Sequence, residues 1–405
     1  QGERELQAQD LAALQELAQI LGNDRRRVEV ALRQARYASF TSDYPAAIAA
    51  AQEGIRLAQV VQDPTSQAVG HYHWGTAANN QGDYETARRQ LEKGMALSRA
   101  ARLRQVEADC LRVLGILTLD QGDYDKAQTY YEESLRISCE EGDRRSESKT
   151  LNNLGNVFGY QGDWASARGY HEQALAVFRE IGDRRSEGVL LGNLGMDTRL
   201  QGDLHAARAY YEQSRLTSHE VGNRDSESRM LGNLGSVSIS LGDLAAARYF
   251  LEQALLLVRE IGRQPEEATI LHRLGLTLAL QGDYAAAGEC CGQSLWIARE
   301  LGDRLAEAEA LGNLGVIFDC VGEYSGARDH HEASLQIACS MGLRLLEGEV
   351  LANLGLLCHH LGEDQAAREY SQRALDIAQE LGACEFEASA VTHLGHALAG
   401  LGHLA

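Results

Sequence analysis

Apolar and small residues recur along most of the chain with the spacing of one helical face, and short glycine-containing turns interrupt them. Between residues 144 and 182, for example, such residues stand at 151, 154, 155 and 158, which places them in one buried stripe of a helix. Gly162 and Asp163 then suit a left-handed helix terminator and the N-cap of a second helix, which ends at Gly182. The pattern predicts two helices joined by a tight turn.

This pair of helices repeats every 40 residues without a gap. The turn reads Gly-Asp-Tyr at 82–84, 122–124 and 282–284, and Gly-Asp-Leu at 202–204 and 242–244. Four residues after the acidic turn residue stands an alanine, as at Ala87, Ala127 and Ala167. So strict a period is typical of a solenoid, in which each repeat buries its apolar face against its neighbours. We therefore predict an all-α solenoid of helix-turn-helix repeats with essentially no strand.

The same period predicts one repeat domain over residues 1–405. It consists of a half-repeat at 1–22, repeats at 24–62, 64–102, 104–142, 144–182, 184–222, 224–262, 264–302, 304–342 and 344–382, and a half-repeat at 384–405. Both ends fall in the turn inside a repeat, and neither carries the polar capping repeat with which solenoids usually end. We expect the sequence to be an excerpt of a longer chain.

Charge and cysteine content narrow the possible partners. The formal net charge is −20, from 58 acidic and 38 basic residues. Nucleic acids and anionic membranes require a basic surface, so neither is expected as the main partner. No apolar run is long enough for a transmembrane helix. The eight cysteines show no paired spacing, which indicates reduced thiols and a cytoplasmic location.

The repeat resembles a known family. Leu151, Leu154, Gly155, Phe158, Ala167 and Ala174 match, in order, the consensus positions of the tetratricopeptide repeat. This resemblance implies a right-handed superhelix of about ten repeats. The 40-residue variant resembles the arrays of kinesin light chain and spindle-orientation adaptors, and equally the sensor arrays of bacterial signal-transduction NTPases. It implies a non-catalytic protein-protein interaction module or, alternatively, a ligand-sensing or autoinhibitory array of a multidomain regulator.

The resemblance also implies which residues line a concave groove formed by the first helices. Early repeats supply mostly polar side chains there, and the middle repeats supply apolar ones, which suit a peptide or a helical segment of a partner. An alternative occupant of the apolar strip is another domain of the parent chain. The expected groove residues are Tyr72, Asn79, Arg112, Asn152, Asn156, Tyr160, Met196, Arg199, Leu200, Arg229, Ile239, Leu276, Leu280 and Val316.

One further family feature is incomplete. The carboxylate clamp, which captures acidic C-terminal peptides, requires a basic residue at repeat position 5 and Asn or Arg at position 9. Here Arg112 is followed by Ile116 at position 9, and only Asn152 and Asn156 partly match the pattern. Binding of chaperone tails is therefore not expected.

The stretch Leu-Gly-Asn-Leu-Gly at 191–195, 231–235 and 311–315 places two glycines inside a predicted helix, where glycine is costly. The second glycine recurs every 40 residues from Gly75 to Gly395, and we interpret it as a packing position that lets two helices approach closely. The first glycine varies between repeats. It either opens the groove wall to a partner or reflects an exposed position without constraint.

Catalysis is not expected. The chain contains no P-loop, no HExxH and no GxSxG motif. His359, His360, Cys320, Cys358 and Asp319 stand in neighbouring repeats, but nothing in their spacing enforces a metal site. Glutamates recur in the first turn of each first helix, where the helix dipole is a sufficient explanation. We interpret the asparagine column at 153, 193, 233, 313 and 353 as structural, and we expect no metal and no cofactor.

Overall fold

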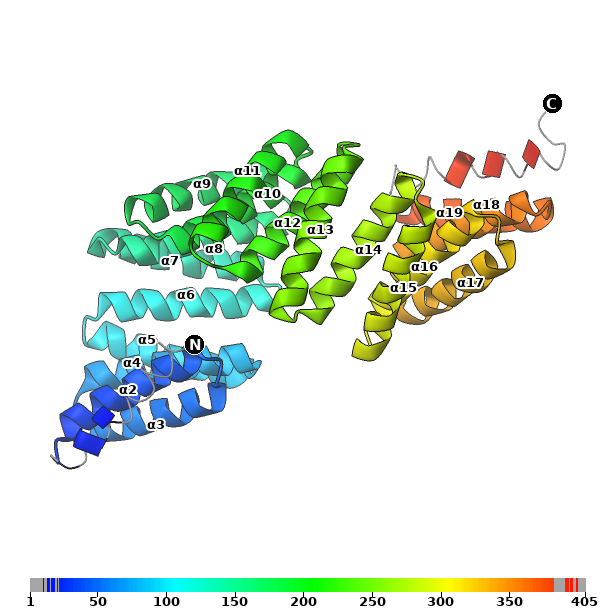
Figure 1. Ribbon diagram of the computed structural model, residues 1–405. Coiled ribbons are helices and arrows are strands. Elements are labelled where there is room, and N and C mark those ends of the chain that lie inside the picture. The colour runs from blue at the N-terminus through cyan, green and yellow to red at the C-terminus, as the bar shows by residue number, and fades with distance from the viewer. Residues whose placement is uncertain are drawn as a thin grey trace. The chain divides into compact units, whose positions relative to one another are not determined.

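The computed structural model describes residues 22–381 without a gap, and also residues 10, 13, 14, 16–18, 20, 390–392, 394, 395, 398 and 399. Between residues 22 and 381 the chain forms helices of 17 or 18 residues and no strand (Figure 1). The predicted half-repeats at 1–22 and 384–405 lie mostly outside the described residues.

Each predicted repeat between residues 24 and 382 contains a first and a second helix. The first helices are α2 (Asp24–Phe40), α4 (Pro64–Gln81), α6 (Arg104–Asp120), α8 (Arg144–Tyr160), α10 (Arg184–Leu200), α12 (Arg224–Ser240), α14 (Gln264–Leu280), α16 (Arg304–Cys320) and α18 (Arg344–His360). The second helices are α3 (Tyr44–Val60), α5 (Tyr84–Ala100), α7 (Tyr124–Glu141), α9 (Trp164–Glu180), α11 (Leu204–Glu220), α13 (Leu244–Ile261), α15 (Tyr284–Leu301), α17 (Tyr324–Met341) and α19 (Asp364–Leu381).

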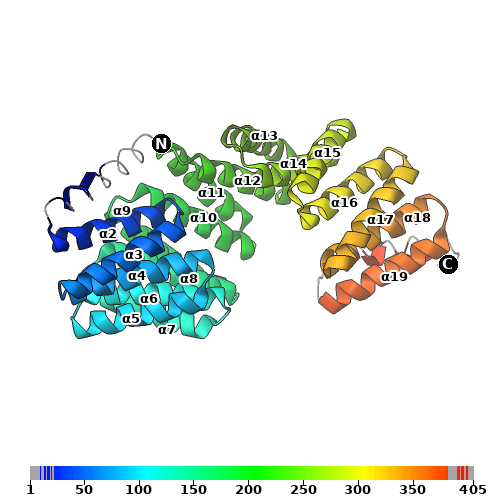
Figure 2. The same ribbon diagram turned by 90° about the horizontal axis from the view of Figure 1, so that it is seen from below.

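The helices fall into two compact units. The N-terminal unit covers Gln1–Asp203 and the C-terminal unit covers Leu204–Ala405. Within each unit, consecutive helices pack side by side (Figures 1 and 2). Each unit is an all-α solenoid of helix-turn-helix repeats, which confirms the predicted fold class. The prediction of a single domain over 1–405 stays a prediction.

Contacts beyond the sequential ones identify the inner surface of each unit. Most first helices contact the next first helix of their unit, as α4 does with α6 and α14 with α16. Among the described residues, no second helix packs comparably against the next second helix. The first helices therefore lie closer together than the second helices, and they line the inner surface of each unit.

The turns form as their residues require. Gly162 has φ of 80°, a left-handed conformation that favours glycine, and Asp163 accepts a hydrogen bond from the Ser166 amide at 3.1 Å. Ser42, Gln62 and Arg102 adopt the same left-handed conformation without being glycines. The repeat geometry thus imposes this backbone even where the side chain disfavours it.

The second glycine of Leu-Gly-Asn-Leu-Gly is a packing position, as predicted. A Cβ atom on Gly275 would lie 2.5 Å from Cys291 Sγ and 3.3 Å from the carbonyl oxygen of Ala287. On Gly235 it would lie 2.6 Å from Leu251 Cγ. These distances are shorter than van der Waals contact, so the first helix approaches the second only because this residue lacks a side chain.

Glutamates that recur in the first turn of the first helices join successive repeats by buried ion pairs. The Glu187 carboxylate is 4% exposed and accepts hydrogen bonds from Arg179 Nε at 2.8 Å and Arg184 Nη1 at 2.5 Å. Glu107 and Glu307 are held by two arginines in the same way. The helix dipole was therefore an incomplete explanation, because each of these three carboxylates also joins the end of one second helix to the start of the next first helix.

Replacing Glu187 by glutamine is expected to lower the free energy of unfolding by about 1 kcal/mol, because the amide keeps one acceptor oxygen and turns an NH2 donor toward the other arginine. Urea unfolding followed by circular dichroism measures the change. Glu260→Gln serves as the matched control, since Glu260 is exposed and makes no ion pair within the described residues, and a change within about 0.5 kcal/mol is expected there. Equal effects of the two variants would contradict a role for the Glu187 ion pairs.

None of the described helices combines the length and the apolar character that a bilayer-spanning segment needs.

Candidate functional site

The apolar residues expected in the groove are exposed on the first helices. In the N-terminal unit, Met196 is 49% and Leu200 43% exposed. In the C-terminal unit, Leu276 is 38%, Leu280 55% and Val316 36% exposed. Their side chains are therefore available to a partner within each unit.

In the C-terminal unit these residues form a strip, which we call the apolar strip and define as Leu276, Leu280 and Val316. Leu276 and Val316 occupy the same repeat position on α14 and α16, and these two helices contact each other. Leu280 lies one helical turn after Leu276. Ile239, by contrast, is partly buried against the core of the unit. The apolar strip thus continues across two neighbouring first helices.

The polar groove residues differ in accessibility. Arg199 and Arg229 are exposed, whereas Asn79 is only 8% exposed and Tyr72 is partly buried. Tyr160 is 67% exposed and stacks on Tyr124 at the start of α7, with 6.1 Å between ring centroids. Asn79 therefore contributes little to the accessible inner surface, which other side chains form at this place.

Asparagines of the repeated column connect successive first helices. Asn193 Nδ2 donates a hydrogen bond to Asn152 Oδ1 at 3.0 Å, and Asn313 Nδ2 lies 3.3 Å from His272 Nδ1. Asn193 and Asn313 thus connect repeats through side chains rather than backbone groups, whereas Asn153 and Asn233 line pockets, and a structural role for the whole column stays a prediction. Asn152 keeps its own amide nitrogen as a donor toward the groove.

One pocket of the N-terminal unit is cationic, and we call it the N-terminal pocket. It has a volume of about 280 Å³ and lies across α6, α8 and α10. Its lining includes Arg112, Lys149, Asn152, Phe178, Arg185 and Ser186. Burial, together with the positive charges of Arg112 and Arg145, lowers the pKa of Lys149.

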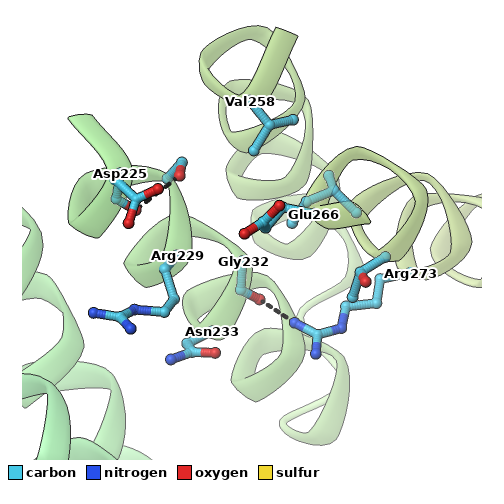
Figure 3. Close-up of a pocket in the computed structure, with 10 residues that line it drawn as sticks. Asp225, Arg229, Gly232, Asn233, Val258, Glu266 and Arg273 are labelled. Carbon is cyan, nitrogen blue, oxygen red and sulfur yellow. Dashed lines mark hydrogen bonds between the residues drawn. The ribbon is translucent and has the colours of Figure 1, made fainter. Parts of the chain in front are cut away.

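An equivalent pocket of the C-terminal unit has mixed charge, and we call it the C-terminal pocket (Figure 3). Its volume is about 200 Å³, and its lining includes Asp225, Arg229, Gly232, Val258, Glu266 and Arg273. Asp225 and Glu266 supply negative charge next to the two arginines. Arg273 Nη1 reaches back to the Gly232 carbonyl oxygen at 3.3 Å (Figure 3).

Gly232 and Gly312 are both the first glycine of a Leu-Gly-Asn-Leu-Gly stretch, but their surroundings differ. A Cβ on Gly232 would lie 2.8 Å from Ile270 Cδ1, so this glycine makes room for the wall of the C-terminal pocket. A Cβ on Gly312 would meet only ordinary contacts, at 3.5 Å from Ser334 Oγ and 3.8 Å from Val350 Cγ2. One copy therefore shapes the pocket, whereas the other lacks steric constraint.

His359 and His360 each pair with an aspartate. His360 Nδ1 lies 2.9 Å from Asp319 Oδ1, and His359 Nδ1 lies 3.1 Å from Asp364 Oδ1. In the part of the chain that the structure describes, no three potential ligands converge on one point. The cysteines within 22–381 form no disulfide, and Cys384 lies outside the described residues.

The sequence analysis did not identify several polar residues that the structure brings together. His171 Nδ1 lies 2.6 Å from Asp197 Oδ2, and both side chains are buried. The signal was present, because His171 and Asp197 replace apolar residues of most other repeats. The sequence analysis also missed Arg185, Glu266 and Arg273. Arg185 and Glu266 lie in the first turn of the next first helix, and Arg273 lies on another face of α14, so none of them is at an expected groove position.

Comparisons with known proteins agree with this architecture. The sequence profile described as tetratricopeptide repeat matches residues 66–140, 146–215, 186–260, 226–288 and 266–340, and a second profile with the same description matches residues 348–381. A comparison with curated proteins found no matching sequence.

Solved structures with the same fold include sensors. The apo form of RapI has a TM-score of 0.73 at 14% identity, covering 88% of this chain and 98% of RapI. The apo quorum sensor NprR from B. thuringiensis has a TM-score of 0.59 at 13% identity, covering 82% of this chain and 94% of NprR. A signal transduction ATPase with a tetratricopeptide repeat sensor, from Pyrococcus horikoshii, has a TM-score of 0.62 at 13% identity, covering 85% of this chain and 55% of the ATPase.

At these identities the structural matches establish the fold alone. The sequence profile covers more than half of the chain, and repeats of this kind form modules for protein interaction or sensing that are typically non-catalytic. The chain belongs to the tetratricopeptide repeat family.

Proposed function

We propose that the chain is a non-catalytic protein-interaction module whose first-helix surface binds a peptide or a helical segment of a partner protein. The apolar strip carries this proposal. Leu276, Leu280 and Val316 are exposed on adjoining first helices, where a solenoid needs no apolar side chain for its own core. Asparagine amides at groove positions, such as Asn152, supply hydrogen bonds for a peptide backbone.

The partner is expected to be a protein or a peptide rather than a nucleic acid or a membrane, because the net charge is −20. Contact with another domain of the parent chain uses the same surface and the same chemistry. A cytoplasmic location stays a prediction.

Negative charge on the apolar strip should weaken peptide binding. We expect peptides selected from a random library on the purified chain to lose at least about tenfold in affinity for Leu276→Glu combined with Val316→Glu, because a buried unpaired carboxylate costs more than 1.4 kcal/mol. Fluorescence anisotropy measures the dissociation constants, and far-ultraviolet circular dichroism verifies that the variant keeps its helices.

Leu256→Glu is the matched control, since Leu256 is 63% exposed but lies on the second helix α13. Its affinity should equal that of the unmodified chain. The proposal fails if no peptide is selected, or if the selected peptides respond to the control and not to the strip variant.

A ligand-sensing array of a multidomain regulator is the second candidate. The similarity to the apo quorum sensor NprR and to a tetratricopeptide repeat sensor of a signal transduction ATPase favours it. Sensing requires a ligand that favours one of two conformations. A selected peptide that changes the radius of gyration in small-angle scattering would support sensing, whereas an unchanged radius would favour a plain scaffold.

A further inference from the structure

The N-terminal pocket gathers more positive charge than its surroundings neutralise. Arg112 Nη2 donates to Asp109 Oδ1 at 3.1 Å. Lys149 and Arg185 make no ion pair within the described residues. Asp183, at the start of α10, accepts from Arg145 at 2.9 Å instead. Three cations therefore face one pocket with one paired carboxylate, in a chain whose net charge is −20.

Arg112, which lines this pocket, has a side-chain donor without a partner among the described residues. Its side chain is 14% exposed, and its Nε atom is buried without a hydrogen-bond partner within the described residues. A buried guanidinium donor without an acceptor is energetically costly. Burial and neighbouring positive charge also lower the pKa of Lys149. Both observations indicate that an acceptor with negative charge would stabilise the pocket.

The fold itself does not require this charge. In the C-terminal pocket, Arg229 occupies the repeat position of Lys149, and Glu266 occupies the position of Ser186. Pro265 stands at the position of Arg185, and Asp225 at the position of Arg145. The C-terminal pocket thus has two acids and two arginines in its lining, and Asp225 also pairs with Arg263 at 3.0 Å. The lining includes two acids in one unit and only basic and neutral side chains in the other, so the cationic pocket reflects its own side chains.

We propose that the N-terminal pocket binds a phosphate monoester group. The three cations less the one carboxylate of Asp109 leave two positive charges, which match the charge of about −1.5 to −2 on a phosphate monoester. A carboxylate would neutralise only one of them. The two guanidinium groups of Arg112 and Arg185 suit bidentate hydrogen bonds to phosphate oxygens, and the Lys149 ammonium serves as a compact point charge.

Neutral donors complete the set. Asn152 Oδ1 is occupied by Asn193, which leaves Asn152 Nδ2 to donate, and the Ser186 hydroxyl also lines the pocket. The cavity of about 280 Å³ is large enough for the phosphoryl group and the atom that carries it. The inference rests on the proposed function, because this pocket is part of the first-helix surface that would hold the ligand.

Inorganic phosphate is the first probe, titrated into the intact chain at about pH 8 by isothermal titration calorimetry. Saturable binding with one site is expected. Arg185→Gln and Lys149→Gln should each weaken it about tenfold, because each removes a charge-assisted hydrogen bond. Arg185 is exposed, so its variant should fold normally even if changes at Arg112 do not. Arg229→Gln in the C-terminal pocket is the matched control and should leave phosphate affinity unchanged.

Acetate distinguishes a phosphoryl site from a carboxylate site and should bind at least about tenfold more weakly than phosphate. Absence of saturable phosphate binding, equal affinity for acetate, or unchanged affinity in both pocket variants would overturn the proposal. A short phosphoserine peptide and glycerol phosphate then separate the sources. Tighter binding of the peptide assigns the group to a phosphorylated side chain, and equal binding assigns it to a small molecule.

Failure here is distinguishable from failure of the proposed function. The apolar strip lies in the C-terminal unit and the cationic pocket in the N-terminal unit. Phosphate binding without peptide selection would overturn only the proposed function. Peptide selection without phosphate binding would overturn only the phosphoryl site.

Discussion

Replacing Gly315 by alanine is expected to lower the free energy of unfolding by about 1–3 kcal/mol. The new Cβ atom would lie 2.5 Å from His331 Cε1 and 2.8 Å from His331 Cγ. His331 is 1% exposed, so its ring has no free space into which it can move. Either the ring leaves its rotamer or α16 moves away from α17, and both changes weaken the packing of the C-terminal unit.

Gly312, three residues earlier in the same helix, is the matched control. A Cβ there meets nothing closer than 3.5 Å, so Gly312→Ala should stabilise the protein by about 0.5–1 kcal/mol through helix propensity alone. Thermal unfolding followed by circular dichroism compares the midpoints. Opposite shifts are expected for two identical substitutions in one Leu-Gly-Asn-Leu-Gly stretch. A stabilising Gly315→Ala would contradict the packing role of the second glycine.

Acidification is expected to destabilise the C-terminal unit through His331. Burial lowers the pKa of this imidazole from 6.5 to about 4, against a smaller opposing effect of Asp319. Among the described residues its Nδ1 has no hydrogen-bond partner, whereas His171 in the same repeat position faces Asp197. The folded protein therefore disfavours the charged form of His331.

The sign of the pH dependence follows from this shift. As the pH falls below about 6.5, His331 binds a proton in the unfolded chain but stays neutral in the folded chain. The contribution of His331 is fully present above that pH and is lost between about pH 6.5 and about pH 4. A shift of this size corresponds to about 3 kcal/mol. Urea unfolding at a series of pH values measures the loss.

His331→Leu is the control, because Leu91 and Leu251 occupy the same repeat position against the same glycine column. The variant should lose this part of the acid sensitivity while it stays folded at neutral pH. His73 also has a pKa of about 4, caused by burial, so some acid sensitivity should remain. Identical pH profiles for the variant and the unmodified chain would contradict the role of His331.

Much of the fold was predictable because each repeat carries its own local signals. Gly162 and Asp163 mark a turn by backbone conformation and by capping, which depend on residues close in sequence. The glycine column was recognisable as a packing position because it recurs at one period. The exposure of Leu276 and Val316 followed from their place on the helical face opposite the core.

Other features depend on residues that only folding brings together. The boundary after Asp203 leaves no mark in the sequence, because the period of 40 residues continues through it. The double ion pair of Glu187 joins Arg179 and Arg184, and only their approach shows that the carboxylate is buried.

The sequence by itself determined the helices, the turns, the repeat and the side of each helix that faces its neighbours, since these follow from backbone preferences and periodicity within a few residues. Only the tertiary structure decided which charges meet in a pocket and which are neutralised. Arg112, Lys149 and Arg185 come from three successive first helices, and their shared potential arises from distances through space and from burial, not from spacing along the chain.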